Sequence, residues 1–241
     1  MTSLQDFIKW NEDKWESKNQ QMYQGTSTNR WPWFSEELDP DISDFLKVHG
    51  IHSAKILDLG TCSGSQAIAL AKMGYQVVGS DISETALAQA KNKTETLPWQ
   101  TQVEFVLDDV LDSRLAPEQF DLILDRGCFH SVCCISTKKY IANVLKLLKA
   151  DGKVLLKTMS LKERRFSDYD VFAGQKIPMP YRFDDEILHN VFAEHFHIEK
   201  ITDSYFYSAV IKPPAQAKLV VLSKKPGVNC LDKAAGENAS I

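Results

Sequence analysis

The sequence predicts a doubly wound α/β fold, in which helices cover both faces of a seven-stranded, mostly parallel sheet. Three observations carry this prediction. Short apolar runs alternate with helical patterns, the first such run ends in a glycine-bounded turn, and an acidic residue follows the second run. Because parallel strands end at one common edge, we expect a ligand to bind at that edge.

The predicted elements follow one another in the order that such a sheet requires. The run 81–84 offers a helix cap with an early acid, the acidic residues 184–186 suit a first helical turn, and Gly152 suits a helix end. Pro213 and Pro214 separate the last two strands, which we expect to pair antiparallel at one end of the sheet, since proline is not tolerated in a central ladder. We expect helices near 41–49, 64–73, 83–93, 138–149 and 183–194, and strands at 55–59, 76–80, 103–107, 120–125, 153–158, 197–206 and 217–223.

A chain of 241 residues, of which 44% are hydrophobic and 25% charged, is long enough for one α/β domain. We assign this domain to residues 40–225. Residues 1–39 are expected to form an N-terminal cap that contributes to the substrate site, and residues 160–182 a lid inserted after the fifth strand. Residues 226–241 lack hydrophobic periodicity, so we expect a disordered tail there.

Composition argues against several classes of protein. The formal net charge of −4 does not favour a nucleic-acid-binding surface, which needs clustered Lys and Arg. No apolar run is long enough to span a bilayer, and no basic-then-apolar leader is present. The five cysteines form no C-x-x-C pair, which fits a reducing compartment. We therefore expect a cytoplasmic monomer or homodimer that binds neither nucleic acid nor membranes.

The turn after the first strand is the main indication of a ligand site. It runs from Gly60 to Gly64, and Asp81 follows the next strand about twenty residues after Gly60, the spacing of a ribose-binding acid. Taken alone, a Gly-x-x-x-Gly bend is equally consistent with a simple tight reversal of the chain. The acid at the second strand end is what favours a nucleotide-type ligand.

The turn departs from the fingerprint of dinucleotide-binding proteins, and these departures indicate which ligand it binds. Cys62 takes the place of the middle glycine, and Gln66 and Ala67 stand where a third glycine is needed, so side chains resist the close approach of a pyrophosphate. Asp58 would repel phosphate but suits a ligand with an ammonium and a sulfonium group. These features favour S-adenosylmethionine over a dinucleotide.

Three segments carry a family resemblance: they are residues 57–64, 79–83 and 105–110. They resemble the first three motifs of class I S-adenosylmethionine-dependent methyltransferases, which share a Rossmann-like, seven-stranded fold, and the resemblance spans residues 30–225. It implies that Asp58, Gly60 and Gly64 surround the methionine part of the cofactor, that Asp81 binds the ribose, and that Asp109 with the Val110 amide meets the adenine. The further cofactor contacts that we expect are Thr61, Cys62, Ile82 and Asp125.

The strand at 120–125 leads into a turn that we expect beside the transferred methyl group. His130 is the candidate catalytic base or hydrogen-bonding anchor for the substrate, because imidazole titrates near neutral pH; a structural helix-capping histidine is the alternative. Asp125 is the second catalytic candidate, with capping of the turn as its alternative. Arg126 either binds an acidic group of the substrate or pairs with an acid of the fold.

Consecutive aromatic residues surround Pro32 in the N-terminal segment. They cannot all face one core from an extended chain, so we expect some to line a cleft. Aromatic faces attract a sulfonium and exclude water. The expected substrate-binding aromatic residues are Tyr23, Trp31, Trp33 and Phe34.

No metal site is expected. Cys128, His130, Cys133 and Cys134 are close in sequence, but neighbouring cysteines point apart on a helix and the spacing matches no standard zinc site. Small buried hydrophobic residues are the simpler interpretation of these thiols.

The acceptor is left open between two classes of substrate. The Pro-Trp pair at 32–33 is similar to the N-terminal signature of thiopurine- and thiol-type small-molecule methyltransferases. The run 125–127 is similar to the strand end of elongation-factor lysine methyltransferases, in which an Asp commonly takes the place of His130. That departure favours a small acceptor (thiol, selenide or amine) methylated by in-line transfer. Protein lysine methylation and a non-catalytic cofactor-binding module are the alternatives.

Overall fold

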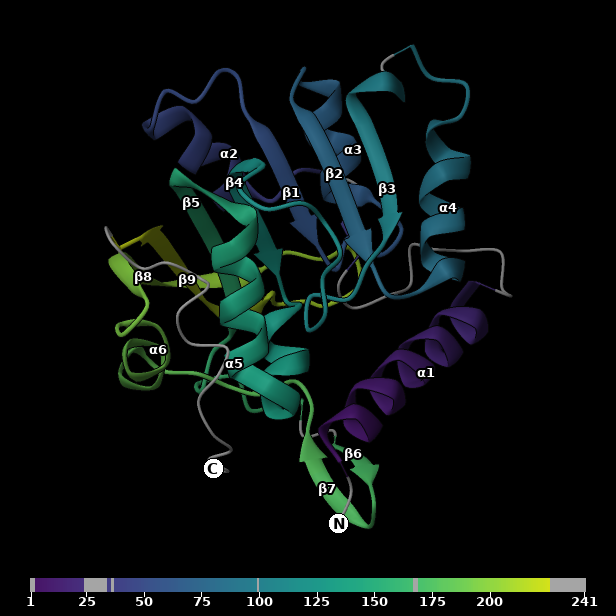
Figure 1. Cartoon of the computed structure of the whole chain (residues 1–241), viewed down its shortest axis with the longest axis vertical. Coiled ribbons are helices and arrows are strands. Elements are labelled where there is room, and N and C mark those ends of the chain that lie inside the picture. Colours follow the sequence, from purple (N-terminus) through teal and green to yellow (C-terminus); the bar gives the residue numbers. More distant parts are fainter. Residues whose placement is uncertain (1–2, 24–33, 36, 99, 167–168, 226–241) are drawn as a thin grey trace.

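The structure is a computed structural model that describes residues 3–23, 34–35, 37–98, 100–166 and 169–225 (Figure 1). Trp31, Trp33 and the tail at 226–241 lie outside the described residues, as does the side chain of Tyr23. The elements in chain order are α1 (Leu4–Tyr23), α2 (Pro40–Val48), β1 (Lys55–Leu59), α3 (Ser65–Lys72), β2 (Gln76–Asp81), α4 (Glu84–Thr94), a 3₁₀ turn (Gln100–Gln102), β3 (Val103–Leu107), β4 (Phe120–Arg126), α5 (Phe129–Leu147), β5 (Leu148–Met159), β6 (Tyr169–Phe172), β7 (Gln175–Pro178), α6 (Asp185–Phe192), β8 (Phe196–Phe206) and β9 (Ala215–Lys224).

A seven-stranded sheet forms the centre of the molecule, with strand order β3-β2-β1-β4-β5-β9-β8. The five strands from β3 to β5 pair in parallel, and β9 runs antiparallel to both β5 and β8. The predicted fold class, the seven strands and the antiparallel last pair are therefore confirmed. The carboxyl ends of β1, β2, β3 and β4 meet at the lower edge of the sheet in Figure 1.

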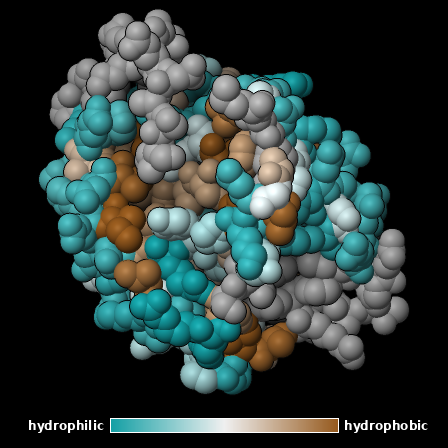
Figure 2. Space-filling view, turned by 90° about the horizontal axis from the view of Figure 1, so that it is seen from below, coloured by the Kyte–Doolittle hydropathy of each residue, from teal (hydrophilic) through white to brown (hydrophobic). Residues whose placement is uncertain are grey.

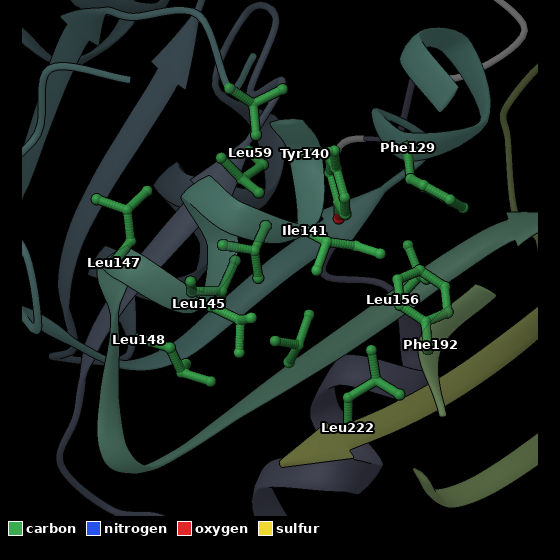
Figure 3. Close-up of a cluster of buried hydrophobic side chains, with 14 of the residues drawn as sticks. Leu59, Phe129, Tyr140, Ile141, Leu145, Leu147, Leu148, Leu156, Phe192 and Leu222 are labelled. Atoms are coloured by element: carbon green, nitrogen blue, oxygen red, sulfur yellow. The ribbon is translucent and has the colours of Figure 1, made fainter. Parts of the chain in front are cut away.

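Alternate residues of the central strands point to opposite faces, and both faces are buried. In β1, Ile56 packs with one hydrophobic cluster, which includes residues of α2, α3 and α4. Leu57 packs with the other, which includes residues of α5 and α6 (Figure 3). Strands buried on both sides need apolar residues at nearly every position, and this explains the continuous apolar runs that predicted them.

Three elements differ from the prediction. Helix α1 was not expected, because its buried positions Ile8, Asn11 and Asn19 are mostly polar and give no clear apolar stripe. Helix α5 begins at Phe129, whereas the sequence predicted a start near 138. The backbone of Ser136 is extended (φ −161°, ψ 94°) and interrupts the helix, so the residues before it do not continue the helical pattern of those after it. The expected lid segment contains the β6–β7 hairpin. None of the described helices is both long and apolar enough to cross a membrane.

A buried ionic network ties the start of α2 to the carboxyl ends of β4 and β5. The Asp39 carboxylate accepts a hydrogen bond from Arg126 Nε at 2.8 Å and also forms an ion pair with Lys157. Lys157 Nζ in turn lies 2.7 Å from the Asp41 carboxylate. Burial alone would raise the pKa of Asp39, but the charges of Lys157 and Arg126 hold it below its usual value. This network therefore holds the start of α2 against the carboxyl ends of β4 and β5.

We predict that Asp39→Asn destabilises the fold by about 3 kcal/mol, because it leaves two buried cations without their shared carboxylate. Denaturant unfolding measures this change. The matched control is Asp13→Asn, which removes an ion pair with Lys9 in which both side chains are 65% exposed and which should leave the midpoint unchanged. Equal midpoints for the Asp39 variant and the wild type would contradict the prediction.

Candidate active site

The turn after β1 holds its backbone in conformations that favour glycine. Gly60 and Gly64 have φ angles of 65° and 79°, and a Cβ added at Gly64 would lie 2.8 Å from the Phe105 ring. Cys62 also has a positive φ of 52°, which costs a residue with a side chain about 1 kcal/mol. The main chain of the turn thus stays close to the sheet edge, where a ligand can approach it.

Two carboxylates flank this turn. Asp58 is buried in β1 and accepts a hydrogen bond from the Thr61 hydroxyl at 2.7 Å, and burial raises its pKa to about 6. Asp81 ends β2 and accepts bonds from the amides of Cys62 at 2.8 Å and Ser83 at 3.0 Å. Burial raises the pKa of Asp81 as well. The backbone bonds hold Asp81 between the turn and the start of α4.

A third carboxylate lies in the loop after β3. Asp109 Oδ1 accepts a bond from the Leu111 amide at 2.8 Å, whereas Oδ2 is buried without a partner among the described residues. Burial raises the pKa of Asp109 to about 6. Val110 is buried beside it, and Ile82 is half-buried after the end of β2. The Oδ2 atom therefore suits a ligand that donates a hydrogen bond.

Helix α1 closes the edge of the sheet on this side. Glu16 accepts hydrogen bonds from the hydroxyls of Ser83 at 2.6 Å and Thr85 at 2.5 Å, at the start of α4. One turn further on, Asn19 Oδ1 lies 3.9 Å from Cys62 Sγ. In Figure 1, α1 runs below the strand ends, from the β6–β7 hairpin to α4.

The β6–β7 hairpin contacts α1, and together the two elements form a cover below the strand ends. Lys14 and Lys18 of α1 both lie 3.4 Å from Asp170 Oδ2 of β6. The side chain of Lys14 is only 7% exposed, and burial lowers its pKa to about 8. Figure 2 looks onto this edge, where hydrophobic residues are exposed in several separate patches. The N-terminal segment expected to be a cap and the inserted segment expected to be a lid are thus joined by ion pairs.

Asp125 caps the turn into α5. Both of its oxygens are in use and the side chain is buried, with burial raising the pKa to about 6. Its donors are the amides of Gly127, Cys128 and Phe129 and the hydroxyl of Tyr140. The geometry therefore matches the capping alternative, and contact of Asp125 with a ligand stays a prediction.

Arg126 belongs to the ionic network described above. Besides pairing with Asp39, it donates a hydrogen bond to the carbonyl of Tyr207 at 2.7 Å. Its side chain is 9% exposed. Of the two alternatives for Arg126, the structure thus displays the pairing with an acid of the fold.

His130 is half-buried beside the same network. Its Nδ1 accepts a hydrogen bond from the Met159 amide at 3.1 Å, so the neutral ring carries its proton on Nε2. Burial and the charge of Arg126 lower the pKa of His130 to about 3. The ring meets Phe206 edge-on, with centroids 5.6 Å apart. This arrangement can donate one hydrogen bond from Nε2.

Phe34 is the only one of the four predicted aromatic residues whose side chain the structure describes. It is 7% exposed and lies 5.5 Å below Lys93 Nζ, and Lys93 Nζ bonds the carbonyl of Ser63 in the turn after β1. Phe34 thus lies on the side of the edge that carries that turn. The roles of Tyr23, Trp31 and Trp33 stay predictions.

Four residues of the site were missed from the sequence. Glu16, Lys14 and Asp170 hold the cover, and Tyr140 supports the Asp125 cap. Each acts on a residue far away in the chain, and a polar residue in a helix or hairpin carries no local sign of such a partner. A weak signal was the number of charged and aromatic residues in the segment 1–39.

Comparison with known proteins identifies the family. A family model described as a methyltransferase domain matches residues 56–152. An uncharacterized methyltransferase of Schizosaccharomyces pombe is 32% identical over 133 residues, which are 55% of this chain and 88% of that protein. The chain belongs to the class I S-adenosylmethionine-dependent methyltransferases. It is an enzyme of this family, and the predicted resemblance is confirmed.

Further relatives of this methyltransferase differ in their acceptors. A protein-lysine N-methyltransferase of S. pombe is 28% identical, covering 61% of this chain and 74% of its own. A probable thiol methyltransferase of Arabidopsis thaliana is also 28% identical, covering 64% and 69%. A solved structure described under the conversion of a disulfide bond into a thioacetal group in echinomycin biosynthesis superimposes with a TM-score of 0.68 at 23% identity, covering 85% and 88%.

The site of the methyltransferase fits S-adenosylmethionine, the cofactor of its family. The unpartnered Oδ2 of Asp109 suits a base amine, and the carboxylates of Asp58 and Asp81 suit cationic and hydroxyl groups. The glycine conformations of the turn after β1 keep side chains out of the ligand's way. When bound, S-adenosylmethionine supplies a methyl group carried on a positively charged sulfur.

We predict that the affinity of the methyltransferase for S-adenosylmethionine rises about tenfold between pH 5 and pH 7.5. With its pKa near 6, Asp58 is mostly protonated at pH 5, and a bound cation favours the ionised form, so binding strengthens as the pH rises through 6. Calorimetric titration measures this change. S-adenosylhomocysteine, which lacks the sulfonium, should show a smaller slope. A slope for S-adenosylmethionine that Asp58→Asn leaves intact would contradict the assignment.

Proposed function

We propose that this methyltransferase acts on a small-molecule acceptor, with a thiol as the best-supported class. The observation that carries the proposal is the cover: Asp170 of the hairpin lies against Lys14 and Lys18 of α1. A sheet edge covered in this way suits an acceptor that is enclosed, since enclosure excludes water and aligns the reacting atoms. A folded protein substrate would need an open approach to the same edge.

The charges at the acceptor end also support a neutral or soft acceptor. The carboxylates of Asp39 and Asp125 are both paired already, the first with cations and the second with four donors. An ammonium acceptor would gain no new partner from either of them. Arg126 adds a positive charge next to His130, which disfavours a second cation there.

The cofactor is proposed to lie along the edge from β1 to β3. Asp58 faces the charged methionine end, Asp81 the ribose and Asp109 the base. The contacts in the turn come from its backbone, so the side chain of Cys62 does not need to take part. The proposed cofactor contacts along this edge are Asp58, Gly60, Thr61, Cys62, Gly64, Asp81, Ile82, Asp109 and Val110, and Asp125 stays a predicted contact beside them.

His130 is proposed as a hydrogen-bond donor that positions the acceptor. With Nδ1 engaged by the Met159 amide and a pKa near 3, the ring has no free basic nitrogen at neutral pH. A thiol ionises near neutral pH and needs no strong base to become a nucleophile. The His130 geometry and a sulfur acceptor therefore agree with each other.

A second candidate function is methylation of a protein lysine. The lysine methyltransferase relative supports it, and so do the exposed aromatic rings of Tyr205 (47% exposed), near the end of β8, and Tyr207 (38% exposed), just after it. Exposed aromatic residues are enriched where a protein partner docks. The acceptor experiment below distinguishes the two functions.

We expect the purified protein to methylate members of a panel of alkyl and aryl thiols and to leave lysine-containing peptides unmodified. Release of S-adenosylhomocysteine, followed by mass spectrometry of the acceptor, measures both reactions. Asp81→Ala is the negative control, because loss of the ribose contact should remove activity with every acceptor. Methylation of peptides without turnover of any thiol would replace the small-molecule proposal by the lysine one.

We predict that His130→Ala raises the KM for the acceptor about tenfold, the effect of one lost hydrogen bond, and changes kcat less. The pH dependence of kcat/KM for the acceptor in the wild type, measured at saturating S-adenosylmethionine, should have no limb near pH 6.5, because His130 stays neutral there. Steady-state kinetics from pH 5.5 to 9 test both statements. A 100-fold loss in kcat together with a limb near pH 6.5 would restore the base role.

A further inference from the structure

The buried face of α1 carries an amide whose hydrogen bonding the fold does not satisfy. Asn11 is 1% exposed, and neither its Oδ1 nor its Nδ2 has a partner among the described residues. A buried amide without partners costs desolvation free energy, and nearly all buried polar side chains in proteins are bonded. Its presence inside a helix interface therefore points to a partner that is not part of the fold.

The contacts of α1 locate Asn11 along the cofactor edge. Asn19 approaches the turn after β1, and Glu16 bonds the start of α4 after β2. Ile8 belongs to the hydrophobic cluster that contains Val110. Positions 8, 11 and 19 are buried positions of the helix and share one face, so the Asn11 side chain lies on the same face as Asn19, about two turns nearer the start of α1.

The loop after β3 supplies the matching unpartnered group. Glu12, the next residue after Asn11, is close enough to Asp109 to raise the pKa of its carboxyl group, after the larger effect of burial. Oδ2 of Asp109 is unpartnered like the Asn11 amide. Two chain segments almost a hundred residues apart thus present unsatisfied donors and acceptors in one region of the edge.

We propose that Asn11 reads the purine base of the cofactor together with Asp109. The amide Oδ1 accepts one hydrogen of the exocyclic amine and Nδ2 donates to the adjacent ring nitrogen, the paired geometry in which Asn matches adenine. Asp109 Oδ2 accepts the other amine hydrogen. This inference rests on the cofactor placement proposed above and is independent of the acceptor.

The test is calorimetric titration of Asn11→Leu with S-adenosylhomocysteine and with its inosine analogue, in which an oxo group replaces the amine. Leu has a similar volume without polar atoms. We expect the Kd for S-adenosylhomocysteine to rise at least tenfold, while the melting temperature of the ligand-free protein stays equal or increases. The wild type should prefer the adenosine ligand strongly, and the variant should lose most of that preference.

Controls separate base recognition from a structural role. Asn92→Leu, at an exposed position of α4, should change neither ligand affinity nor preference. Asn11→Ala is the second variant, because it cannot overfill the interface. A lowered melting temperature in both Asn11 variants with an unchanged preference for adenosine would overturn the proposal, as would unchanged affinity. If the wild type bound neither ligand, the cofactor placement would fall with it, whereas a failed thiol screen alone would leave Asn11 unaffected.

Discussion

The pairing of Asp39 with Arg126 and Lys157 is the interaction on which the acceptor side of this enzyme depends. Each of the three side chains is at most 9% exposed, so Asp39 compensates two buried cations at once, and Asp41 is a second partner of Lys157. Asp39 precedes α2, Arg126 ends β4 and Lys157 lies near the end of β5. A single carboxylate therefore sets how a helix and two strands meet. The backbone carbonyls of Tyr205 and Tyr207 extend the same network to β8 and its following loop.

Two further acids of the edge are held by backbone amides instead of ion pairs. Asp81, the last residue of β2, accepts bonds from the amides of Cys62 and Ser83, and Asp125, next to the end of β4, accepts bonds from the amides that follow it. Asp81 keeps contact with a ligand-binding turn, whereas Asp125 is saturated by the start of α5 and by Tyr140. The two acids thus differ in how many donors surround them, and this difference is why Asp81 rather than Asp125 is the one proposed to meet the ligand.

The sequence was sufficient for features that depend on local pattern. The apolar runs of the strands, the glycines at 60 and 64 and the spacing to Asp81 gave the fold, its family and the edge that carries the site. The partner of Arg126 lies 87 positions away, so spacing could not choose between substrate and fold. The protonation of His130 depends on the Met159 amide, a long-range contact of the same kind. Helix α1 escaped notice because its buried positions are polar, a feature that the proposed base recognition by Asn11 would explain.

Helix α1 is attached on two flanks at once, by Glu16 to the start of α4 and by Lys14 and Lys18 to the hairpin. One helix therefore contacts both the start of α4, beside the proposed cofactor edge, and the β6–β7 hairpin. Under the placements proposed above, the spent cofactor would leave and the next acceptor would enter past the same helix, so a change that loosens α1 would affect the exchange of both ligands together.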